Sequence, residues 1–292
     1  MKSFFAAIIV LVIAASCNFS KSVEKDFISG ILTKGDGLSC DNVYLSVNDE
    51  ETKQSTFIYG QKFKMNFDNI SGFKKENANV FPGMEMIVTN NIGDTALYSG
   101  DLYSGYTEGF NLSPLLLSAT VTPASPINSG GEYTLYVKIW DKKDDGTFTG
   151  EVDFKVVPND NLIVDANKII FTELYLFSKE RGAVIPDNQI KLNETVYIIY
   201  EGLTGFQEEN NMVYPGLSLT AKDNDGNVVL DNKDMFIEYS EKGISTGDVR
   251  ARVSANFILN GSEFNNPMHL EMTIWDKKSD ARITAKAELY AE

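Results

Sequence analysis

The sequence contains few of the residues that most often carry out catalysis or bind metals. Among its 292 residues are two cysteines, Cys17 and Cys40, and one histidine, His269. So few thiols exclude a disulfide framework, and His269 has no second imidazole with which to share a metal ion or a proton. No Gly-rich phosphate-binding loop precedes a helical pattern. We therefore expect no enzymatic activity, no metal and no cofactor.

The sequence also lacks a basic excess and a long apolar run. Lysine and arginine number 26 against 41 acidic residues, and the net charge is −15. This charge argues against a nucleic-acid partner and against lying flat on an anionic bilayer. The apolar stretch from Phe4 to Ala15 is shorter than the roughly 20 residues of a membrane-spanning helix. With Lys2 before it and small residues after it, the stretch predicts a secretory signal peptide over residues 1–16.

The end of this segment suggests a lipid anchor. Ala14-Ala15-Ser16-Cys17 resembles the lipobox of bacterial lipoproteins, although Ala14 stands where leucine is commoner. The resemblance implies that Cys17 is acylated, with palmitate among its acyl chains, and that residues 17–25 form a lipidated tether. Cys40 would then have no disulfide partner. An ordinary signal peptide followed by a chance cysteine is the alternative.

The chain contains a duplicated phrase. Ile-Trp-Asp-Lys-Lys occurs at 139–143 and again at 274–278, and it holds both tryptophans. Copies of about 130 residues are domain-sized, unlike the 20–50 residues of stacked repeats. They indicate two domains, 26–157 and 161–292, joined at the turn-rich Pro158-Asn159-Asp160. Flanking residues recur in the same order, with Gly72-Phe73, Pro82-Gly83 and Gly93 matched by Gly205-Phe206, Pro215-Gly216 and Gly226.

The hydrophobic period within each copy is two. Leu135, Val137 and Ile139 alternate with polar residues, and the same alternation recurs before Trp275. Such runs are typical of half-buried antiparallel strands. About seven short strands per copy, separated by turns, predict an all-β protein. We expect two tandem immunoglobulin-like antiparallel β-sandwich domains after a lipoprotein signal peptide.

The arrangement of signal peptide, lipidated Cys17 and tandem β-sandwiches resembles the envelope lipoproteins of the Bacteroidota. The resemblance is one of layout and covers the whole chain. It implies a lipid-anchored protein of the cell envelope, at the outer membrane, with the membrane as one partner. Which face of that membrane carries the protein stays open.

The duplicated phrase has a functional and a structural interpretation. By the alternation, Trp140 and Trp275 point away from the apolar face, where an indole could stack on a sugar ring or a partner. They could instead cover the end of the sandwich while Asp141 and Asp276 fix the following turn. We favour the structural role because both copies keep the whole phrase.

A second aromatic group suggests a ligand site. Tyr98, Tyr103, Tyr106 and Phe110 alternate with glycines, and aromatic side chains on such a loop suit carbohydrate or protein recognition. Ordinary packing is the alternative. The second copy has no counterpart of Tyr98 or Phe110, so these two are the better ligand candidates. The acidic loop 141–146 has a lysine where a calcium-binding loop needs oxygen, so we expect no metal there.

Two functions of different class follow. In the first, a non-catalytic, lipid-anchored envelope protein binds a glycan, peptide or protein partner through its sandwich loops. In the second, the protein is a structural or assembly subunit of an envelope or fimbria-like complex and pairs through a strand edge. A concave groove with exposed aromatics would favour the first. A detachable first strand, which we place around 27–32, would favour the second.

Overall fold

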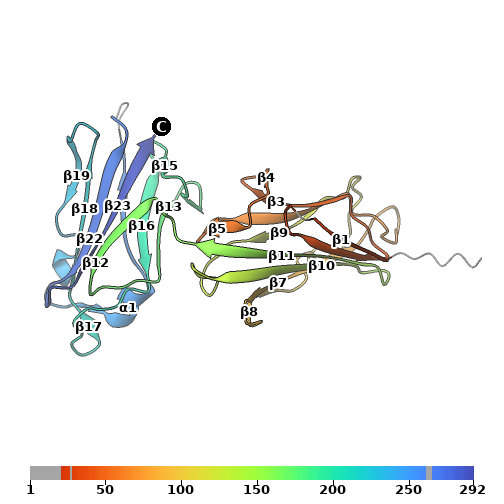
Figure 1. The fold of residues 1–292 in the computed structure, drawn as a ribbon, viewed down its shortest axis with the longest axis horizontal. Helices are drawn as coiled ribbons and strands as arrows, with labels where there is room; N and C mark the ends of the chain where they lie inside the picture. The colour runs from red at the N-terminus through yellow and green to blue at the C-terminus, as the bar shows by residue number, and fades with distance from the viewer. Residues whose placement is uncertain (1–20, 27, 261–264) are drawn as a thin grey trace, which may run out of the picture.

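The computed structural model describes residues 21–26, 28–260 and 265–292. Within these ranges the chain forms two β-sandwiches that follow one another along the molecule (Figure 1). Nearly all elements are strands, so the predicted all-β class and immunoglobulin-like sandwich architecture are confirmed. The predicted signal peptide 1–16 and Cys17 lie outside the described residues. Among those described, no helix is long and apolar enough to cross a membrane.

The first sandwich consists of a larger and a smaller sheet. The larger sheet has the strand order β1-β2-β11-β10-β7-β8, with β5 added parallel to β11, and the smaller has the order β4-β3-β6-β9. The remaining pairings are antiparallel. The strands are β1 Lys21–Lys25, β2 Leu32–Asp36, β3 Asn42–Val47, β4 Glu50–Thr52, β5 Thr56–Ile58, β6 Phe63–Asp68, β7 Pro82–Asn90, β8 Thr95–Ser99, β9 Leu117–Val121, β10 Glu132–Asp141 and β11 Thr147–Val157.

The second sandwich repeats this plan. Its larger sheet has the order β12-β23-β22-β18-β19, with β15 parallel to β23, and its smaller sheet has the order β14-β13-β16-β21. A separate pair, β17 and β20, lies beside one short helix. The elements are β12 Leu162–Asn167, β13 Glu173–Ser178, β14 Ala183–Val184, β15 Gln189–Ile190, β16 Thr195–Glu201, β17 Met212–Val213, β18 Pro215–Lys222, β19 Val228–Asn232, η1 Ile237–Tyr239, β20 Ile244–Ser245, α1 Thr246–Ala251, β21 Val253–Ile258, β22 Met268–Asp276 and β23 Arg282–Ala291.

Within the described residues, strand β1 has no counterpart in the second sandwich. The orders of the two larger sheets agree when β2 is matched with β12, and β12 is an edge strand whereas β2 is covered by β1. Residues 21–25 of the expected lipidated tether 17–25 form this strand, which pairs with β2 from Lys21↔Asp36 to Lys25↔Leu32. The physical reason is that an edge strand offers unpaired N–H and C=O groups to any extended segment beside it.

The first strand lies at 21–25 and not around 27–32, because residues 28–31 form the turn between β1 and β2; residue 27 lies outside the described residues. The Asp26 carboxylate accepts hydrogen bonds from the backbone N–H groups of Ile28, at 2.9 Å, and Ser29, at 3.3 Å. An aspartate that bonds the backbone two and three residues on favours a turn over a strand.

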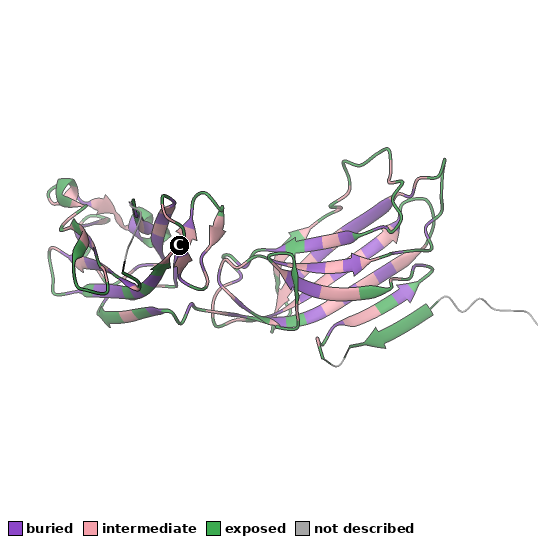
Figure 2. Cartoon of the chain, turned by 90° about the horizontal axis from the view of Figure 1, so that it is seen from above, coloured by how far each residue is buried: buried purple, intermediate pink, exposed green. Residues whose placement is uncertain are grey.

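The core of each sandwich lies between its two sheets. Leu135, Val137 and Ile139 of β10 are fully buried, and Leu270 and Ile274 take equivalent positions in β22. Figure 2 shows the resulting alternation of buried and less buried positions along the long strands. Strand β1 differs, since it is exposed at all five positions. It adds to the sheet through its backbone and contributes nothing to the core.

A cluster of tyrosines and glutamates joins the sandwiches. The hydroxyls of Tyr59 and Tyr175 donate hydrogen bonds of 2.9 and 2.7 Å to the Glu201 carboxylate. Glu173, only 2% exposed, accepts bonds from the backbone N–H and the hydroxyl of Ser129, at 2.8 and 2.7 Å. Burial raises the pKa of the Glu173 carboxyl, although the bonds from Ser129 oppose this. Tyr175 packs with the core of the first sandwich, so the junction is a specific contact.

Candidate functional site

The repeated Ile-Trp-Asp-Lys-Lys phrase makes matching contacts in the two sandwiches. Trp140 lies opposite Gly83 in the neighbouring strand, and a Cβ added to that glycine would come within 2.1 Å of the indole. Trp275 covers Gly216 in the same way, with the same 2.1 Å. Each indole therefore lies flat on a strand where only glycine leaves it room.

The aspartate of the phrase closes the end of each sandwich. Asp141 is buried and accepts a hydrogen bond of 2.6 Å from the backbone N–H of Lys74 and one of 2.9 Å from that of Lys143. Asp276, equally buried, accepts the bond from Gln207 at 2.7 Å. Each carboxylate thus ties a loop distant in sequence to the end of the long hairpin.

The lysines of the phrase are also engaged within the fold. Lys142 Nζ lies 2.6 Å from Asp101 Oδ2, and Lys277 lies 2.8 Å from Asp234. Burial acts to raise the pKa of Asp101, but bonds from Lys142 and two backbone N–H groups outweigh it and lower that pKa. These side chains have partners inside the protein, as the structural interpretation of the phrase expects.

Three of the four aromatics proposed as ligand contacts lie together between β8 and β9. The ring centroids of Tyr103 and Tyr106 are 5.7 Å apart, and those of Tyr106 and Phe110 are 5.1 Å apart. Tyr103 and Phe110 are half-buried against the core, whereas Tyr106 is 56% exposed. Tyr98 lies apart from them in β8, opposite Ile87, and is itself largely exposed. The structure therefore does not bring all four into one site.

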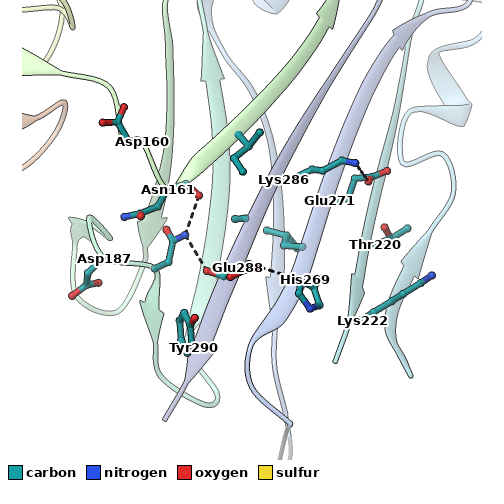
Figure 3. Close-up of a pocket in the computed structure, with 14 residues that line it drawn as sticks. Asp160, Asn161, Asp187, Thr220, Lys222, His269, Glu271, Lys286, Glu288 and Tyr290 are labelled. Carbon is teal, nitrogen blue, oxygen red and sulfur yellow. Dashed lines mark hydrogen bonds and ion pairs between the residues drawn. The ribbon is translucent and has the colours of Figure 1, made fainter. Parts of the chain in front are cut away.

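A better-formed candidate is a groove on the outer face of the second sandwich's larger sheet, which we call the polar groove (Figure 3). It encloses about 660 Å³. Its floor consists of outward-facing side chains of β18, β22 and β23, and one wall comes from the link between the sandwiches. The polar and aromatic side chains of the groove are those of Asp160, Asn161, Asp187, Asn188, Thr220, Lys222, His269, Glu271, Lys286, Glu288 and Tyr290.

The floor of the polar groove is two parallel rows of side chains. In one row Thr220, Glu271 and Lys286 lie opposite one another across three strands. Lys286 Nζ is 3.3 Å from Glu271 Oε2. Because adjacent strands lie about 4.8 Å apart, each row presents a polar group at regular short intervals.

The second row has the same character. Lys222, His269 and Glu288 lie opposite one another, and His269 Nδ1 is 3.8 Å from a Glu288 carboxylate oxygen. Tyr290 follows on the same face of β23 and is 40% exposed. The two rows together offer hydrogen-bond donors, acceptors and one aromatic ring at one concave surface.

The wall of the groove is held in place by a buried asparagine. Asn188 is 3% exposed, and its amide donates hydrogen bonds to the backbone carbonyls of Asn161, at 3.2 Å, and Glu288, at 3.0 Å. The backbone N–H of Tyr290 donates to the Asn188 carbonyl at 3.0 Å. The wall is therefore bonded directly to the strand that forms the floor.

No group of three or more His, Cys, Asp or Glu side chains in the described ranges is placed to hold a metal ion. Gly243-Ile244-Ser245-Thr246-Gly247 has the residue spacing of a hydrolase nucleophile turn. Ser245, however, is the N-cap of α1, with φ −60° and ψ 140°, and its hydroxyl accepts a bond of 3.0 Å from the N–H of Asp248. This is the geometry of an ordinary helix cap.

Sequence reasoning did not identify the polar groove. The period-two pattern before Trp275 indicated which side chains of β22 point outward. It gave no indication that the link residues Asp160 and Asn161 rise beside them, because that contact depends on the tertiary path of the chain. An acidic and asparagine-rich link next to a mixed-charge strand face was the available signal.

Comparisons with known proteins identify no family. No protein-family model matches the chain, and no curated protein matches it either. Among solved structures, the C-terminal domain of wzt is 12% identical, with 46% of this chain and 81% of that chain covered and a TM-score of 0.30. A DUF3823 family protein from Bacteroides ovatus is 11% identical over 73% and 92% of the two chains, with a TM-score of 0.20.

The C-terminal domain of the AgI/II polypeptide BspA from Streptococcus agalactiae is 10% identical. The match covers 85% of this chain and 100% of that one, with a TM-score of 0.24. Similarities at this level carry no argument about function. Function has to be argued from the surface of this chain.

Proposed function

We propose that this protein is a non-catalytic, lipid-anchored protein of the cell envelope that binds a glycan in the polar groove. The observation that supports this most is the double row of alternating donors and acceptors on the groove floor. Sugar hydroxyls both donate and accept hydrogen bonds, so a surface that offers both at short intervals suits them. Tyr290 supplies a flat apolar surface against which a sugar ring can lie.

The floor favours a glycan over an extended peptide. A peptide strand binds to a sheet mainly through backbone groups at an exposed edge. The groove instead lies on the face of β22 and β23, whose backbone groups are already paired within the sheet. Only side chains are available there; most belong to polar residues, and Ile163 adds an exposed apolar one.

The proposal also includes a lipid anchor and a location in the cell envelope. Acylation of Cys17 would hold the first sandwich at the outer membrane, and the second sandwich would carry the groove. The lipobox-like residues and the tandem all-β layout support this assignment to a Bacteroidota-type envelope lipoprotein. The contacts of Tyr59 with Glu201 and with the Tyr175 ring would hold the second sandwich in a fixed orientation on the first.

The test is a glycan array followed by calorimetric titration of the best glycan, using the chain from residue 18. Lys286→Met and Glu271→Gln each remove groups that can bond the ligand, and each should weaken binding about tenfold, the effect of one lost hydrogen bond. The matched control is the exposed cross-strand pair of Glu132 and Lys155 in the first sandwich, 2.5 Å apart. Glu132→Gln and Lys155→Met should leave affinity unchanged. Absence of any bound glycan would contradict the proposal.

Strand β1 favours a second candidate function, assembly with another envelope subunit through a strand edge. All five residues of β1 are exposed, and the second sandwich forms without such a strand. Release of β1 would uncover the edge of β2 for a strand from a partner.

Assembly through the edge of β2 is tested by deleting residues 18–25 and measuring the oligomeric state. A folded protein that forms higher assemblies, or binds a peptide of sequence KSVEK, would support it. A folded monomer with no affinity for that peptide would contradict it.

A further inference from the structure

Four apolar side chains are exposed on the connection between β8 and β9. Leu112 and Leu116 are 60% and 59% exposed, and Tyr106 is 56% exposed. The connection has two faces, because Tyr103 and Phe110 pack against the core while these side chains face outward. We call the exposed set the basal tip, and its members are Leu102, Tyr106, Leu112 and Leu116.

Backbone bonds fix the basal tip at one end of the first sandwich. The Leu115 carbonyl accepts a bond from Ile70, just beyond β6, and Phe110 pairs with Val80, just before β7. Strand β1 starts at this same end, because Lys21 pairs with Asp36, and Asp36 pairs with Thr147 beside the β10–β11 turn. In Figure 1 this end of the first sandwich points away from the second.

We propose that the basal tip rests on the membrane surface, with its leucines and Tyr106 among the lipid headgroups. The inference rests on the proposed acylation of Cys17. Four residue steps separate Cys17 from Lys21, and a fully extended chain covers about 3.4 Å per residue, or about 14 Å. An acylated Cys17 therefore keeps Lys21, at the same end of the first sandwich as the basal tip, within about 14 Å of the bilayer.

The chemistry of the basal tip matches that position. Tyrosine is enriched at membrane interfaces, where its ring is apolar and its hydroxyl is hydrated. Moving exposed leucines from water to the acyl boundary lowers the free energy of the system. The acyl chains of Cys17 supply the second membrane contact that stable anchoring requires, since one weak signal alone binds reversibly.

Glu108 in the connection and Asp144 and Asp145 in the β10–β11 turn add negative charge at this end, so a zwitterionic lipid surface suits it better than an anionic one. Lys142 is paired with Asp101 at 2.6 Å, and Lys143 with Glu76 at 2.9 Å. Asp36 lies 3.1 Å from Lys21. With these lysines neutralised within the protein, contact with phosphatidylethanolamine through apolar side chains is favoured over attraction to anionic lipid.

The experiment uses the full-length lipidated protein in phosphatidylethanolamine vesicles that contain headgroup spin-labelled lipid. A fluorophore on Leu112→Cys reports contact by its quenching. The matched control is Ile92→Cys, 78% exposed in the turn after β7. It lies at the other end of that nine-residue strand, about 30 Å away. Wild type, treated in the same way, gives the background from Cys40.

We expect the label at 112 to be quenched several-fold more strongly than the label at 92. Adding Tyr106→Ser and Leu116→Ser to Leu112→Cys should reduce that quenching markedly, which separates docking from mere tethering. Vesicle flotation is measured first. Protein that fails to float contradicts the acylation of Cys17, and the inference falls with it. Protein that floats with equal quenching at 112 and 92 overturns the docking alone.

Discussion

The hydroxyl of Tyr59 in the first sandwich lies 2.9 Å from Glu201 Oε2 in the second and donates a hydrogen bond to it. The same hydroxyl accepts a bond of 3.1 Å from the backbone N–H of Ser125. The Tyr59 ring also packs against Tyr175, with centroids 5.5 Å apart. One side chain thus connects both sandwiches and the segment that follows β9.

Tyr59→Phe should weaken this junction while preserving the ring packing. Hydrogen bonds to charged groups contribute about 1.5–3 kcal/mol, so we expect a loss of that size in the free energy of unfolding. Small-angle scattering should show a wider range of orientations between the sandwiches. Tyr98→Phe, which removes an exposed hydroxyl, is the control and should change neither quantity. A junction unchanged by Tyr59→Phe would show that the bond to Glu201 is not needed, and that the Ser129–Glu173 bonds and apolar packing hold the sandwiches together.

Gly83→Ala should destabilise the first sandwich because Trp140 occupies the space that the new methyl group needs. Overpacking of this kind costs about 1–3 kcal/mol, which thermal unfolding can measure. The control is Gly105→Ala, because an added Cβ there meets no atom within 4 Å. If the two variants melt alike, the indole does not pack on Gly83 as described, and Trp140 becomes available for a ligand.

Phe110→Ala and Tyr98→Ala should behave differently, although sequence reasoning grouped the two residues. Phe110 packs against the core and Tyr103, so its loss should cost about 3 kcal/mol, the low end for phenylalanine because the ring is only half-buried. Tyr98 is 62% exposed, and its loss should stay within about 0.5 kcal/mol. Chemical denaturation measures both. Equal effects would contradict the separation of the two residues.

The Cys40 thiol should react slowly in the folded protein. Burial raises its pKa to about 11, although its bonds to the carbonyls of Asn42 and Asp68 act in the opposite direction. Because the reactive form is the thiolate, a pKa raised from 9.0 to about 11 lowers the rate about 100-fold. Ellman's reagent at pH 8 measures this against the denatured chain.

The raised pKa of Cys40 also determines how the free energy of unfolding changes with pH. A pKa that is higher in the folded state means that Cys40 contributes stability below pH 9 and loses it as the pH rises through about 11. Replacing it with serine should flatten the stability profile over that range. Rapid labelling of folded protein at pH 8 would show that Cys40 is accessible.

The sequence predicted the β-class and the buried faces because alternation is a local property of a strand. Leu135, Val137 and Ile139 had to share a face, and they do. It did not predict β1, since KSVEK has no alternating apolar pattern and joins the sheet only through its backbone. Edge pairing of that kind depends on which strand is left uncovered by the tertiary fold.

The candidate site was harder to predict than the fold. The aromatic group of copy one attracted attention by composition, yet Tyr103 and Phe110 are half-buried packing residues. The polar groove is assembled from β18, β22, β23 and a link whose Asp160 is remote from His269 in the chain. Such a surface exists only after folding, and no single stretch of sequence contains its pattern.

Mapping a bound glycan on the folded protein tests whether the polar groove is the binding site. Backbone amide spectra of the labelled chain should be recorded while the best glycan from the array is added. We expect the largest shift changes on residues 160–161, 269–271 and 286–290, and we expect Tyr290→Ala to weaken binding whereas Tyr98→Ala does not. Shift changes centred on Tyr98 and Tyr106 of the first sandwich, with those three segments unmoved, would contradict this expectation.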